Sequence, residues 1–116
     1  MTTPAHTTSV TGRAVRWVDD EYPGWVEVQL TDAHGVVWSL VDKAPVFDDE
    51  DRLRPTTAYP VEVQVGCEVV GRGRLDDGTE VLTVSTRLPW GIEAVGGRTE
   101  FLVDVHQVTA DRGAEV

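Results

Sequence analysis

The sequence predicts an all-β domain, and three observations support that fold class. In residues 61–69 apolar side chains alternate with polar, charged or glycine positions. Only a β-strand places residues i, i+2 and i+4 on one face, so this segment has one buried and one wet face. Similar alternation recurs along the chain, and no window of ten or more residues keeps helical spacing. The 116 residues also include 21 valines, whose β-branched side chains fit a pleated, half-buried surface.

Three strands are predicted in the first half of the chain, at residues 10–18, 25–31 and 36–42. Acidic residues followed by Pro23 and Gly24 mark the turn between the first two. The link between the second and third ends at Gly35, which is typical of a type I turn followed by a glycine bulge. These two strands therefore form a hairpin, and Trp17 and Trp38 are expected in the core.

A long irregular connection, residues 43–58, separates these strands from the rest and carries four consecutive acidic residues. Connections of this length are uncommon in small domains and are often functional. A single helical turn is expected around residues 48–53. The next strand, residues 61–72, contains Gly66 and Gly71, which allow it to bend or bulge.

The second half of the chain predicts a strand at residues 79–87, after the Asp76-Asp77-Gly78 turn. Residues 88–91 break the pattern, and Gly96-Gly97 then predicts a hairpin between residues 92–95 and 98–108. Polar residues dominate both ends. We therefore expect one domain over residues 10–108, with flexible tails at residues 1–9 and 109–116.

These strands must bury one face without a substantial helix to cover it, so a sandwich or a closed barrel is required. The bent fourth strand favours a single small β-barrel of about six to seven mostly antiparallel strands. The preferred architecture is a six-stranded Greek-key barrel, like the second domain of translation elongation factors. An oligonucleotide-binding-type (OB) or SH3-like barrel is the alternative. Architecture alone implies no function.

Charge and hydropathy narrow the function classes. Twenty acidic against ten basic residues give a net charge of −10, which disfavours nucleic-acid binding because phosphates require clustered Lys and Arg. No signal peptide and no apolar run of about 20 residues are present, so we expect a soluble cytoplasmic protein with no membrane partner. Frequent valine and arginine with a single lysine indicate a GC-rich bacterial gene.

No residue pattern indicates catalysis, a cofactor or a metal, and we predict a non-enzymatic protein. The single cysteine, Cys67, lies on the apolar face of its strand, and we interpret it as buried. His106 and Asp104 share one strand face, but no nucleophile motif accompanies them. The acid run lacks the spaced ligands and central glycine of a calcium loop.

The preferred hypothesis is a module that binds another protein, for example an immunity-type or accessory protein with a basic partner. Its candidate contact residues combine acids for electrostatic steering with aromatic anchors: Phe47, Asp48, Asp49, Glu50, Asp51 and Trp90. One alternative is a small-molecule-binding barrel or minor enzyme, with a pocket near Trp90, Arg87 and His106. Another is a nucleic-acid-binding barrel that uses a local arginine face, formed from Arg13, Arg16, Arg72, Arg74, Arg87 and Arg98. A homo-oligomer is compatible with each of these hypotheses.

Overall fold

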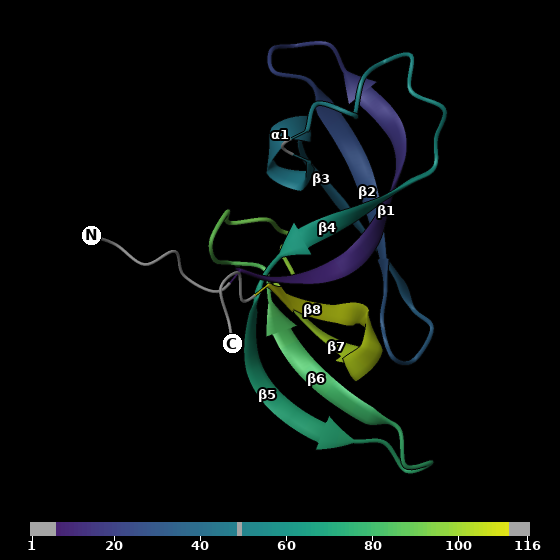
Figure 1. The fold of residues 1–116 in the computed structure, drawn as a ribbon, viewed down its shortest axis with the longest axis vertical. Coiled ribbons are helices and arrows are strands. Elements are labelled where there is room, and N and C mark those ends of the chain that lie inside the picture. The colour runs from purple at the N-terminus through teal and green to yellow at the C-terminus, as the bar shows by residue number, and fades with distance from the viewer. Residues whose placement is uncertain (1–6, 49, 112–116) are drawn as a thin grey trace, which may run out of the picture.

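A computed structural model describes residues 7–48 and 50–111, and it contains two antiparallel β-sheets (Figure 1). The all-β class predicted from the sequence is confirmed. The elements in chain order are β1 (Thr7–Asp19), β2 (Trp25–Thr31), β3 (Val37–Lys43), α1 (Ala44–Phe47), β4 (Val61–Gly66), β5 (Glu68–Arg74), β6 (Glu80–Ser85), β7 (Glu100–Asp104), the 3-10 helix η1 (Val105–Gln107) and β8 (Val108–Asp111). Among the described residues, no helix is long and apolar enough to cross a membrane.

The larger sheet has the order β3-β2-β1-β4, with β8 also paired to β1. Strand β1 is long enough to pair with three strands. Its first residues pair with β8, its middle with β4 and its end with β2. Register shifts between Ala14 and Arg16, and again between Trp17 and Asp19, mark bulges in β1. The predicted β2–β3 hairpin is confirmed, with Trp25 opposite Lys43 and Thr31 opposite Val37.

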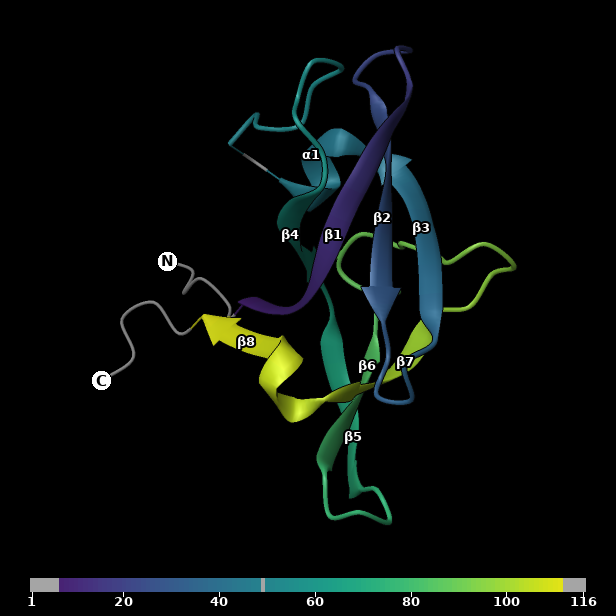
Figure 2. The same ribbon diagram turned by 90° about the vertical axis from the view of Figure 1, so that its right-hand side faces the viewer.

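The smaller sheet has the order β5-β6-β7. The strand predicted over residues 61–72 is divided at Cys67: β4 belongs to the larger sheet and β5 to the smaller one. Figure 2 shows the chain running from β4 downward into β5. The predicted bend is thus present and carries the chain from one sheet to the other. Neither sheet closes on itself, so the structure confirms the β class but not the barrel.

Alternating apolar residues from both sheets form one hydrophobic core. Val10 and Val28 of the larger sheet and Val84 and Phe101 of the smaller one have no exposed surface. Trp38 packs edge-on against Phe101, with ring centroids 5.9 Å apart. Trp17 and Trp38, both expected in the core, are half-buried and pack against it. Cys67 is 4% exposed, which confirms its predicted burial at the junction between the sheets.

Several boundaries differ from the sequence-based predictions. The short helix forms at Ala44–Phe47 instead of 48–53, with Pro45 in its first turn. Residues 92–95 do not form a strand: Ala94 makes an isolated bridge to Leu40 instead. The predicted strand 98–108 is divided by η1, which Asp104 caps by accepting the backbone N–H of His106.

The folded region is longer than predicted. Strand β1 begins at Thr7 and β8 ends at Asp111, and these segments pair with each other. Residues 7–9 and 109–111, which were assigned to the tails, therefore belong to strands. Their pairing joins the two ends of the chain, so no pattern of neighbouring residues could predict it. The remainder of both predicted tails, residues 1–6 and 112–116, lies outside the described residues.

Candidate functional site

Two acids of the run after α1, Asp48 and Asp51, pair with the two arginines that follow it. Both carboxylate oxygens of Asp48 accept hydrogen bonds from Arg52, at 2.8 Å from the backbone N–H and 2.9 Å from Nε. The Asp48 side chain is only 5% exposed as a result. The carboxylate of Asp51 pairs with the guanidinium of Arg54. Glu50 stays exposed, 3.9 Å from Arg52, and Asp49 lies outside the described residues.

Further hydrogen bonds hold the acidic loop, residues 48 and 50–59, in place. Thr57 Oγ1 donates to the Arg52 carbonyl at 2.7 Å, and Tyr59 Oη donates to the Arg54 carbonyl at 2.7 Å. Leu53, between the two arginines, is buried in the core. Asp48 and Asp51 therefore do not present free charge for steering a partner, contrary to the role expected of them. The spacing Asp48–Arg52 and Asp51–Arg54 was the sequence signal for this pairing.

Phe47 does not lie on the surface. It is the last residue of α1, 3% exposed, and belongs to the hydrophobic core cluster. The expectation that it anchors a partner is therefore wrong for this structure. Helix α1 lies against β4, and Phe47 belongs to the same buried cluster as Val63 and Val65, where removal of its ring from water is favourable.

Trp90 is the predicted aromatic anchor that the structure exposes. It is 57% exposed, and Leu88 in the same loop is 46% exposed. One edge of the indole rests on the end of β4: a methyl group on Gly66 would lie 3.2 Å from Cδ1 and 3.3 Å from Nε1 of Trp90. We name residues 87–91 the Trp90 loop.

The Trp90 loop is held at both ends by buried groups. Thr86 and Ile92, on either side of it, have no exposed surface. The Ile92 backbone N–H donates to the Thr86 carbonyl at 3.0 Å, and Thr86 Oγ1 donates to the Ile92 carbonyl at 2.6 Å. The Thr86 N–H also donates to the Thr99 carbonyl at 2.8 Å. Two exposed apolar side chains are thus presented on a short loop with fixed ends.

Two of the four tryptophans donate their indole N–H groups to side chains of this domain. Trp17 Nε1 donates to Asp20 at 2.6 Å and Trp38 Nε1 donates to Asp32 at 2.9 Å. Trp25 lies under the ammonium group of Lys43, which is 5.5 Å from the ring centroid. Among the described residues, the N–H of Trp90 has no hydrogen-bond acceptor, so it remains able to donate to another molecule.

Two carboxylates on the larger sheet have shifted pKa values for structural reasons. A hydrogen bond from Ser39 Oγ, 2.6 Å from Glu27 Oε2, is the main cause that lowers the pKa of Glu27. Burial alone would raise the pKa of Asp32, but hydrogen bonds from Trp38 and from the backbone at 34 and 36 outweigh it and lower that pKa. Both groups brace the β2–β3 hairpin, and neither requires a catalytic explanation.

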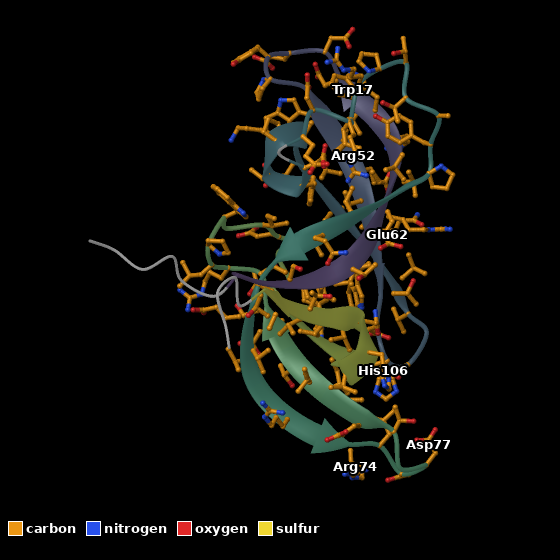
Figure 3. All side chains as sticks on the ribbon, in the orientation of Figure 1. Trp17, Arg52, Glu62, Arg74, Asp77 and His106 are labelled. Carbon is orange, nitrogen blue, oxygen red and sulfur yellow. The ribbon has the colours of Figure 1, made fainter. Side chains whose placement is uncertain are left out.

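The remaining chemical candidates lie apart from one another. His106 Nδ1 is 2.9 Å from Asp104 Oδ1, but the side chain is 92% exposed and lies in the half of the molecule that carries Arg74 and Asp77, away from Trp17 and Arg52 (Figure 3). Of the arginines considered for a basic face, Arg16 pairs with Glu27 and Arg98 stacks 4.5 Å from the Trp38 ring. Among the described residues, no group of three His, Cys, Asp or Glu side chains is placed to hold a metal ion.

A shallow depression of about 300 Å³ that is open to solvent, named here the cavity, adjoins the Trp90 loop. Its walls come from the end of β3 and from the segment after the loop, and they are formed by Val41, Asp42, Gly91, Glu93, Ala94, Val95, Gly96 and Gly97. Its lining includes Gly91 of the Trp90 loop but none of Trp90, Arg87 and His106, around which a pocket was expected. No sequence pattern linked residues 41–42 to residues 91–97.

Comparison with known proteins gives no relative: no family model, no curated protein and no solved structure matches this chain.

Proposed function

We propose that this protein is a non-enzymatic binding module that recognises another protein through the Trp90 loop. The observation that carries the proposal is the exposure of Trp90 and Leu88 on a loop whose ends are clamped by Thr86 and Ile92. Tryptophan is enriched among the residues that dominate binding energy at protein interfaces.

A clamped loop makes an effective contact surface for two physical reasons. Burying exposed apolar area contributes about 25 cal/mol per Å². Because the loop ends are already fixed, association also loses less conformational freedom than it would with a mobile loop. The indole N–H of Trp90 can then supply one directional hydrogen bond to the partner.

The charge of the protein supports a basic partner, as in an immunity-type or accessory protein. The chain has a net charge of −10, and complementary charge raises association rates, an effect that salt screens. Since Asp48 and Asp51 are paired internally, we assign this steering to the net charge of the domain and not to the acidic loop.

We also propose that the two sheets together surround the core as in a barrel. The chain is continuous from β4 into β5 and from β7 through η1 into β8, and both β4 and β8 pair with β1. Chain continuity at two corners therefore links the two sheets around one core. Such a scaffold would hold the Trp90 loop rigidly.

The test compares three immobilised proteins in lysate of the source organism: wild type, Trp90→Ala and Tyr22→Ala. Tyr22 is 93% exposed in the β1–β2 turn, so its replacement is a control for loss of a surface aromatic residue. Quantitative mass spectrometry should find proteins retained by wild type and Tyr22→Ala but lost from Trp90→Ala. For a purified partner we expect affinity to fall about 30-fold or more, equivalent to about 2 kcal/mol. Identical retention by all three proteins would refute the proposal.

A further inference from the structure

The cavity beside the Trp90 loop is formed where the chain crosses the edge of β3. Ala94 bridges to Leu40, and the Val95 N–H donates to the Ser39 carbonyl at 2.8 Å. Beyond this contact the two segments separate, and the cavity of about 300 Å³ lies between them. That volume is at the small end of the range of about 300–1,000 Å³ for ligand pockets, which suits one inserted side chain.

Three of the residues that line the cavity are glycines. Gly96 and Gly97 adopt φ values of +97° and +93°, and a methyl group on either would contact nothing within 4 Å. Gly91, with φ of +70°, joins the cavity to the Trp90 loop. Any occupant of the cavity would therefore lie next to the Trp90 loop.

The side chains of the cavity combine apolar and acidic groups. Val41 and Val95 are exposed, at 36% and 72%, and Asp42 and Glu93 supply two carboxylates. Among the residues that the structure describes, neither carboxylate has a basic group within 4.0 Å. The adjacent Lys43 does not neutralise Asp42 by an ion pair, because its ammonium group lies over the Trp25 ring.

We propose that this cavity receives an arginine or lysine side chain from the protein that the Trp90 loop binds. The aliphatic stem of such a side chain would pack against Val41 and Val95 on the outward face, where its cationic end would pair with Glu93. Asp42 lies on the opposite face of β3 and would add its charge from the other side of this strand edge. The inference rests on the proposed function, since the cavity adjoins the Trp90 loop through Gly91. It adds the chemistry of the partner: a basic side chain placed beside the surface that contacts Trp90.

The test uses blocked arginine, N-acetyl-arginine-N-methylamide, and its neutral analogue, blocked citrulline. Each is titrated into the ¹⁵N-labelled protein at low ionic strength, and amide chemical shifts are followed by NMR. Blocked arginine should give saturable shifts at Gly91, Gly96 and Gly97, with a dissociation constant in about the millimolar range. Blocked citrulline should give none. Absence of saturable shifts with arginine, or equal shifts with citrulline, would overturn the inference.

Variants that lack the two carboxylates test whether blocked arginine binds at the cavity. The double variant Asp42→Asn/Glu93→Gln should weaken blocked arginine about fivefold or more, because pairs with exposed groups each contribute a modest factor. The matched control Asp76→Asn/Glu80→Gln removes two exposed acids from the β5–β6 hairpin and should leave binding unchanged. Equal weakening in both double variants would show a general effect of net charge and would overturn the assignment to the cavity.

Failure of this inference is distinguishable from failure of the proposed function. If Trp90→Ala loses a captured partner while Asp42→Asn/Glu93→Gln keeps it with unchanged affinity, the Trp90 loop is the contact surface and the cavity is not. If both variants keep the partner equally, the proposed function itself is wrong. Loss of the partner from both, with retention by Tyr22→Ala, supports both.

Discussion

Replacing Thr86 by valine removes the side-chain hydrogen bond that closes the Trp90 loop. In the wild type Thr86 Oγ1 donates to the Ile92 carbonyl at 2.6 Å, and both residues have no exposed surface. Among the described residues, that carbonyl has no other hydrogen-bond donor, so the variant leaves a buried acceptor unpaired. The two backbone hydrogen bonds of Thr86 remain, because the substitution does not alter the main chain.

The expected loss of stability follows from these contacts. An unpaired buried carbonyl costs about 1–3 kcal/mol, and the added valine methyl offsets up to about 0.8 kcal/mol through apolar burial. We therefore expect the free energy of unfolding to fall by about 1–2 kcal/mol. With a urea dependence of about 2 kcal/mol per molar, the denaturation midpoint should fall by about 0.5–1 M.

The assay is urea denaturation followed by tryptophan fluorescence, with Thr83→Val as the control. Thr83 lies in β6 and is half-buried, and among the described residues its hydroxyl donates no hydrogen bond. The control should stay within about 0.5 kcal/mol of wild type. Equal stability of Thr86→Val and wild type, or an equal loss in Thr83→Val, would refute the reasoning that this hydrogen bond clamps the loop.

Three further predictions concern backbone conformation, a thiol and a carboxylate. Gly24→Ala should destabilise the fold by about 2–4 kcal/mol, because φ is +99° and the new methyl would lie 2.1 Å from an indole carbon. Gly35→Ala, with φ of +82° in open space, should cost only about 1 kcal/mol in the same thermal unfolding measurement. Burial and, secondly, the neighbouring acid raise the pKa of Cys67 from 9.0 to about 11. The unfolded thiol therefore loses its proton first, and stability measured by urea denaturation should fall by roughly 1–3 kcal/mol as pH rises from about 9 to 11. Ser39→Ala should raise the lowered pKa of Glu27, followed by ¹³C NMR titration, because it removes the main hydrogen bond to that carboxylate.

Each of these predictions has an outcome that would contradict it. Equal melting temperatures for the two glycine variants would show that the indole gives way without penalty. A Cys67→Ala variant that keeps the same decline in stability between pH 9 and 11 would assign the decline to other groups. An unchanged pKa of Glu27 in Ser39→Ala would transfer the main role to its ion pair with Arg16.

Part of the candidate site could be predicted from the sequence. The Pro-Trp-Gly segment interrupts the alternating pattern, so Trp90 was expected in a loop, but only the structure showed that its side chain is exposed. The sequence did not show that Phe47 is buried, because an isolated aromatic residue beside acids gives no indication of which way its short helix turns. The role predicted for the acidic run was wrong at Asp48 and Asp51 for a related reason. Its charge was visible, but its pairing with Arg52 and Arg54 depends on the path of the loop.

By itself, the sequence determined most of the strands, the β2–β3 hairpin, the bend near Cys67 and the burial of that residue. These features depend on alternation and turn residues within a few positions, where side-chain direction is fixed by the backbone period. Only the tertiary structure decided the pairing of β8 with β1, the division into two sheets and the cavity between residues 41–42 and 91–97. Those features join segments about fifty or more positions apart, and which distant segments meet is set by the packing of the whole core.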